Sequence, residues 1–174
     1  MKFLISRFFQ SYRILPALLS VVLLFSLSEK GIAQEPPPRP VEVTVVNNLG
    51  FGAFTHGVSG GTITVNATGS RSATGTVIPL NLGFSFSAAA FRLVANPGTL
   101  ITILNGPPVS LHGSNGGSMT LTTGATDPLS PFVIATTPPA YTNMTIGGTL
   151  TVGNSASNPP GSYSGTFDIT FIQE

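Results

Sequence analysis

The sequence contains no cysteine and no tryptophan, and charged residues make up only 7% of its 174 residues. An average globular protein has about 25% charged residues. Without cysteine the chain has no disulfide, no thiolate nucleophile and no cysteine-ligated metal site. Beyond residue 33 three arginines stand against five carboxylates, so the chain lacks the basic face that binding to nucleic acid requires.

Titratable side chains are also too few to provide the acids, bases and nucleophiles that most hydrolytic or redox reactions need. The two histidines, His56 and His112, lie in a stretch without a carboxylate that runs from Glu42 to Asp127. A zinc site with three protein ligands, or an acid–base pair, would need such carboxylates beside them. We therefore predict that the protein is not an enzyme, with no catalytic residue, no metal site and no cofactor.

The first 33 residues have the pattern of a cleaved signal peptide. A basic start is followed by fourteen almost entirely apolar residues at 14–27, and small residues at Gly31 and Ala33 precede a cut before Gln34. The apolar run is shorter than the roughly 20 residues of a membrane-spanning helix. The alternative is an uncleaved signal that anchors the chain, which would be its one membrane contact. Either reading predicts a secreted or extracytoplasmic protein, in the periplasm or at the cell surface.

After this segment the sequence divides into a Pro-rich leader at residues 34–40 and a domain at residues 41–174. No part of that domain keeps apolar residues at helical spacing, whereas period-two alternation recurs throughout it. Turn sequences such as NPG at 96–98 and NPPG at 158–161 separate the alternating runs. The pattern predicts an all-β fold in which about eight short strands form an antiparallel two-sheet sandwich.

The two terminal strands are the most regular of these runs. Val41, Val43 and Val45 alternate with polar residues at the start of the domain, as Phe167, Ile169 and Phe171 do within a last strand predicted over 163–172. The polar faces carry threonine and serine instead of the charged side chains that normally keep exposed edges from pairing. We therefore predict that these six residues mark strand-pairing edges, used by protein partners or by a second copy of the chain.

Several short motifs, taken in order, resemble a known family. They are LGFGAF at 49–54, GGTITV at 60–65, GSR at 69–71, AFRL at 90–93, IGGTLTV at 146–152 and GSYSGTF at 161–167. Over roughly residues 41–172 this set resembles the secreted bacterial β-domains of domain-of-unknown-function family 4402. The closing strand is also similar to that of spore-coat-U-type and pilin-like subunits, which resemble chaperone–usher subunits with an incomplete immunoglobulin-like sandwich.

The resemblance implies an exported bacterial, fimbria-like subunit that is structural or adhesive and has an immunoglobulin- or pilin-like sandwich. A glycan- or matrix-binding module is the alternative, and Phe51, Phe54 and Tyr141 are its candidate ligand-facing aromatic residues. Phe51 and Phe54 are equally compatible with a place in the core, because phenylalanine is usually buried. Arg92 alternates with apolar neighbours, and we expect it to pair with Asp168 or Glu42 on the outer face of the sheet.

Overall fold

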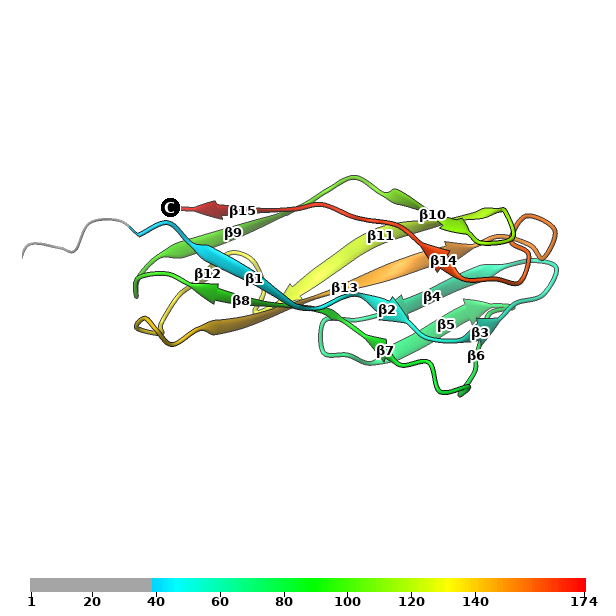
Figure 1. Cartoon of the computed structure of the whole chain (residues 1–174), viewed down its shortest axis with the longest axis horizontal. Helices are drawn as coiled ribbons and strands as arrows, with labels where there is room; N and C mark the ends of the chain where they lie inside the picture. Colours follow the sequence, from blue (N-terminus) through cyan, green and yellow to red (C-terminus); the bar gives the residue numbers. More distant parts are fainter. Residues whose placement is uncertain (1–38) are drawn as a thin grey trace, which may run out of the picture. The chain divides into compact units, whose positions relative to one another are not determined.

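The computed structural model describes residues 39–174, and within that range the chain is built from strands and turns (Figure 1). The predicted signal peptide, residues 1–33, and most of the leader lie outside the described residues. In the described range no helix is long and apolar enough to span a membrane.

The strands follow the alternating runs of the sequence closely, although several are very short. In chain order they are β1 (Glu42–Asn47), β2 (Gly50–Phe51), β3 (Phe54–Thr55), β4 (Gly61–Val65), β5 (Arg71–Gly75), β6 (Ile78–Pro79), β7 (Phe86–Ser87), β8 (Ala89–Val94), β9 (Leu100–Asn105), β10 (Val109–Gly113), β11 (Ser118–Asp127), β12 (Phe132–Val133), β13 (Thr142–Val152), β14 (Tyr163–Ser164) and β15 (Ile169–Gln173).

The main sheet has eight strands and curls strongly into a half-barrel (Figure 1). Its order is β1-β8-β13-β11-β10-β14, and β4 and β5 extend it from β13. The long strand β13 pairs along one edge with β11; along the other edge its first half pairs with β8 and its second half with β4. Every pair of strands is antiparallel, so the prediction of an all-β, antiparallel fold is confirmed.

A second sheet, in the order β12-β9-β15, shares no strand pairing with the half-barrel, and two further pairs, β2-β7 and β3-β6, complete the described strands. The prediction of one continuous last strand over 163–172 is wrong. β14 pairs with β10 in the main sheet, whereas β15 pairs with β9 in the second sheet. The chain passes from one sheet to the other between them, so residues 165–168 belong to neither ladder.

Two apolar clusters form the core, one at each end of β13. The first gathers side chains from β4, β10, β11 and the second half of β13; the second gathers side chains from β8, β9 and the first half of β13. Leu49 and Phe167 pack against both clusters. These two partly buried residues therefore mark the place where the two clusters meet.

One other expectation differs from the structure. Arg92 does not pair with Asp168 or Glu42. Its guanidinium lies 4.4 Å from the centre of the Tyr141 ring, and Glu42 instead forms an ion pair of 2.6 Å with Arg39.

Gly147 sits where β8 leaves the edge of β13 and β4 takes its place. A Cβ added there would lie against the carbonyl oxygen of Val65 and within 2.8 Å of the backbone nitrogen of Ala67. These are backbone atoms, so they move only if the end of β4 shifts. The change of partner along β13 therefore depends on the missing side chain at this position.

We expect Gly147→Ala to lower the free energy of unfolding by about 1–3 kcal/mol, because overpacking a well-fitted site forces the backbone to move. Gly124→Ala is the matched control, since its Cβ would meet its nearest atoms, those of Gly147, at an ordinary 3.5 Å. Thermal unfolding followed by circular dichroism should show a loss of several degrees in Tm for the first variant and little change for the second. Equal Tm values for the two variants would contradict this account of β13.

Candidate functional site

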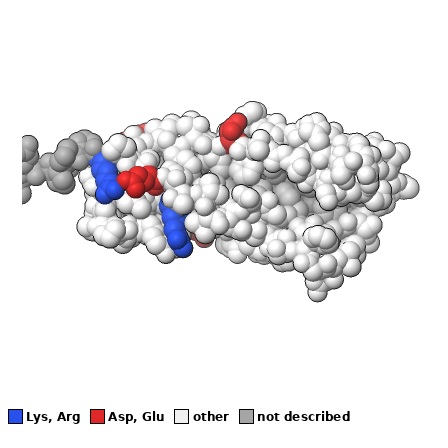
Figure 2. Space-filling model, in the orientation of Figure 1, with Lys and Arg blue, Asp and Glu red and all other residues white. Residues whose placement is uncertain are grey.

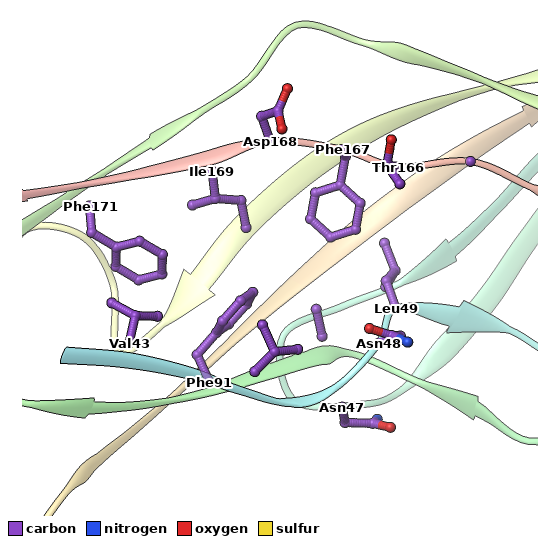
Figure 3. Close-up of a pocket in the computed structure, with 13 residues that line it drawn as sticks. Val43, Asn47, Asn48, Leu49, Phe91, Thr166, Phe167, Asp168, Ile169 and Phe171 are labelled. Carbon is purple, nitrogen blue, oxygen red and sulfur yellow. The ribbon is translucent and has the colours of Figure 1, made fainter.

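A groove of about 530 Å³ separates the first strand of the domain from its last segment (Figure 3). We call it the terminal groove. Its apolar lining comes from three parts of the chain and consists mainly of Val43, Val45, Phe91, Phe167, Ile169 and Phe171. Five of the six residues predicted as strand-pairing edges thus line one groove, and the sixth, Val41, packs against the second apolar cluster.

Strand geometry explains why these side chains converge. Successive residues of an extended chain point to opposite sides, so Phe167, Ile169 and Phe171 share one side. In Figure 3 these three point toward Val43 and Phe91 across the groove, while Asp168 points away from them. The alternation predicted for the last segment therefore holds even across the residues that belong to neither sheet.

Each strand that flanks the groove has one edge without a strand partner in the described chain. β1 pairs with β8 alone, and β15 pairs with β9 alone. An unpaired edge presents backbone N–H and C=O groups that can template another strand. The terminal groove therefore combines apolar side chains with two such edges.

The side chain of Gln173 joins the two strands at one end of the groove. Its Nε2 donates to the carbonyl oxygen of Arg39 at 2.8 Å, and its Oε1 accepts from the backbone N–H of Val41 at 2.8 Å. The amide thus binds one donor and one acceptor of the backbone just before the first strand, as a neighbouring strand would. Nothing in the alternation of the sequence indicated this role, because it depends on how close the two ends lie.

A second cavity, of about 630 Å³, continues from the terminal groove, and Leu49, Gly165 and Phe167 line both. Phe51 and Phe54 line the second cavity from one side and Tyr163 from the other. The two cavities thus lie along the line that separates the beginning of the domain from its end, and they meet where the two apolar clusters meet.

Charge is nearly absent from these surfaces. Asp168 is the one Asp, Glu, Lys or Arg that lines either cavity, and its carboxylate points away from the apolar side chains (Figure 3). In Figure 2 the charged side chains on this face gather in the half where the described chain begins, outside the lining of the terminal groove apart from Asp168, and the opposite half carries none. An apolar, uncharged partner fits such a surface better than an ionic ligand.

The candidate ligand-facing aromatic residues do not form one exposed patch. Phe51 is buried in the first apolar cluster, and Phe54 is a partly buried residue that packs against this cluster. Tyr141 is exposed but lines neither cavity, and Arg92 covers its ring. Of the two positions that the sequence allowed for Phe51, the core and a ligand-facing surface, Phe51 occupies the core.

Two polar side chains of the second cavity, those of Asn158 and His56, interact with the backbone. Asn158 is fully buried: its Oδ1 accepts from the N–H of Gly153 at 2.5 Å, and its Nδ2 donates to the carbonyl of Ser118 at 2.7 Å. Nε2 of His56 lies 3.0 Å from the carbonyl oxygen of Asn158. Among residues 39–174 no group of three or more His, Cys, Asp or Glu side chains is placed to hold a metal ion.

Comparison with known proteins gives a family and no further relative. No curated protein and no solved structure matches the chain. One family model, described as Domain of unknown function (DUF4402), matches residues 41–172, the same range over which the short motifs resemble it. That range begins at the first strand and includes both sides of the terminal groove. Because the match covers most of the sequence, the chain belongs to the DUF4402 family.

Proposed function

We propose that the protein is an exported structural or adhesive component of the cell surface, similar to a fimbrial subunit, and that it associates with partners by strand pairing. The observation that carries this proposal is the terminal groove, where two unpaired strand edges face one apolar cleft. The partner would be another protein or a second copy of the chain. The proposal includes no catalytic step and no cofactor.

Strand addition is a recurring way for proteins to bind extended segments. Main-chain hydrogen bonds to a free edge supply affinity, and pockets for alternate side chains supply specificity. The terminal groove offers both. β1 and β15 each have a free edge, and Phe167, Ile169 and Phe171 face Val43 across the groove. In Figure 1 the arrows of β1 and β15 run in opposite directions, so an added strand would be parallel to one and antiparallel to the other.

An immunoglobulin- or pilin-like sandwich with one strand missing fits this proposal. The second apolar cluster takes side chains from the main sheet, such as Leu93, and from the smaller sheet, such as Ile101, as a two-layer core does. In such an arrangement the partner's strand would complete the layer between β1 and β15. The resemblance of the closing motif to pilin-like subunits supports the same arrangement.

Export to the periplasm or the cell surface rests on the first 33 residues. A basic start, an apolar run too short to span a bilayer and small residues before Gln34 together favour a cleaved signal. The absence of cysteine is compatible with export, because bacterial β-proteins outside the cytoplasm often fold without disulfides. The glycan-binding alternative has less support, since Phe51 is buried and Tyr141 lies apart from it.

Removing residues 2–33 should keep the protein in the cytoplasm when the tagged chain is expressed in a bacterium. The full chain should instead be found outside the cytoplasm, shortened by about the mass of its first 33 residues if the signal is cleaved. Cell fractionation with mass spectrometry of the intact chain measures both quantities. A full chain recovered uncut from the cytoplasm would contradict the export half of the proposal.

A charge placed in the terminal groove should weaken strand binding. We expect Val45→Glu to reduce the affinity for a labelled peptide with the sequence of residues 41–47 by tenfold or more, because a carboxylate would replace apolar contact there. Val46→Glu is the matched control: Val45 is 60% exposed and Val46 50% exposed, but only Val45 lines the groove. Fluorescence anisotropy gives both affinities. No binding of the peptide to the unaltered chain, or equal losses in the two variants, would argue against strand pairing in this groove.

A further inference from the structure

The apolar row along the last segment of the chain ends on a polar side chain. Successive members of this row are two residues apart, so they lie on one side of the extended chain: Phe167, Ile169, Phe171 and Gln173. The first three line the terminal groove, and Gln173 lies beyond them, at the end where β1 begins. Gln173 is partly buried there, and its amide needs hydrogen-bond partners because an unpaired buried amide is costly.

The two backbone groups that Gln173 binds belong to different residues. Its Nε2 donates to the carbonyl oxygen of Arg39 and its Oε1 accepts from the N–H of Val41, so the amide passes over Pro40. In a parallel ladder one residue bonds in the same way to the two residues on either side of its neighbour. The Gln173 amide therefore stands in for one residue of a strand that runs parallel to β1.

The same edge of β1 continues beyond Gln173. The backbone groups of every second residue of a strand point to the same edge, so Val43 and Val45 direct theirs to the side on which Val41 meets Gln173. β8 pairs along the opposite edge, and no strand within residues 39–174 pairs with this one. The next acceptor and donor for an added strand are thus the carbonyl of Val41 and the N–H of Val43.

We propose that Gln173 closes one end of the terminal groove and sets the direction and the register of the partner's strand, an inference that rests on the proposed strand-pairing function. The partner's strand begins beside Gln173, with its first residue opposite Glu42. It then runs parallel to β1 and antiparallel to β15. Its first N–H donates to the carbonyl of Val41 and its first C=O accepts from the N–H of Val43.

A strand in the reverse direction fits this edge less well. In an antiparallel ladder the hydrogen-bonding unit is the N–H and the C=O of one residue, which exchanges both bonds with the residue opposite. Gln173 takes the C=O of Arg39 and the N–H of Val41, which belong to two such units, so it would leave the second half of each unused. In the parallel pattern the amide takes one complete unit, and the next unit starts at the carbonyl of Val41.

Gln173 also limits where the partner's strand can start. Its amide occupies the edge of the chain opposite Pro40, so any residue that precedes the first residue of the partner's strand has to displace it. At the other end the groove remains open, because Leu49 lines both the terminal groove and the second cavity. The partner's strand can therefore be extended at its C-terminal end and not at its N-terminal end.

The first experiment compares labelled peptides by fluorescence anisotropy. The reference peptide has the sequence of residues 41–47, and two longer peptides carry three prolines at either the N-terminal or the C-terminal end. Prolines are used because they cannot donate to the carbonyl of Arg39 in place of Gln173. For the unaltered chain, the N-terminal extension should weaken binding by about tenfold, since two hydrogen bonds must break, and the C-terminal extension should have little effect.

Gln173→Ala should abolish this difference, so that both extended peptides bind with the same affinity. Thr170→Ala is the matched control: Thr170 lies in the same strand, β15, is exposed and does not line the groove, so the difference should persist in this variant. Melting followed by circular dichroism establishes beforehand that both variants are folded. Equal affinities of the two extended peptides for the unaltered chain, or the same difference in Gln173→Ala, would overturn the role of Gln173.

The second experiment determines the direction of the bound peptide in a chain that keeps Gln173. The sequence has no cysteine, so a single introduced thiol reports a single contact. Arg39→Cys places a thiol beside Gln173, and Asn48→Cys places one at the far end of the same side of the groove. A peptide with an N-terminal cysteine should form a disulfide with the first variant, and a peptide with a C-terminal cysteine should form one with the second. Mass spectrometry counts the adducts.

The outcomes separate this inference from the proposed function. Disulfides in the reverse combination mean that the peptide lies antiparallel to β1; the direction is then wrong, and strand pairing stands. No binding of any peptide to the unaltered chain overturns both the inference and the proposed function. Disulfides in the expected combination, together with the loss of the length preference in Gln173→Ala, support both.

Discussion

Every strand edge must give its N–H and C=O groups to a neighbouring strand, a side chain or water, and this requirement is met differently on the two sides of β1. On one side β8 supplies a ladder from Glu42 to Asn47, with one bulge between Val45 and Asn47. On the other side the Gln173 amide satisfies only the chain at Arg39 and Val41, before the strand begins. The edge beyond that point faces the terminal groove, and the placement of the last segment follows from this unpaired edge.

The terminal groove exists because the first and last strands of the domain belong to two different sheets. β13 holds the main sheet together because one of its edges pairs first with β8 and then with β4. Gly147 lies where the pairing partner changes. The last segment starts in that sheet as β14 and ends in the other as β15. β1 and β15 therefore belong to different sheets, and their side chains meet across the groove while their backbones do not pair.

Period-two alternation was sufficient to predict which residues within each terminal segment share a side, because the side on which a side chain lies is a local property of an extended chain. Val43, Val45 and the three apolar residues of the last segment were all found in this way. Phe91 and Leu49 were not, since the pairing of distant strands decides their place in the lining. The burial of Asn158 was hidden for a similar reason: its Asn-Pro-Pro-Gly context is that of an exposed turn, and only the approach of Ser118 and Gly153 makes it a buried hydrogen-bonding centre.

The low content of charged residues affects how the faces and edges of the sheets can interact with a partner. Threonine hydroxyls pair with one another across the strands, as between Thr62 and Thr74 at 2.7 Å and between Thr64 and Thr149 at 2.9 Å, so a sheet face stays polar without lysine or glutamate. Charged side chains at an edge would repel an incoming strand or cost desolvation when it docks. If partners meet this protein through backbone and alternating apolar side chains, a lining in which Asp168 is the one charged side chain keeps that desolvation cost low, and specificity then has to come from the shape and spacing of the groove.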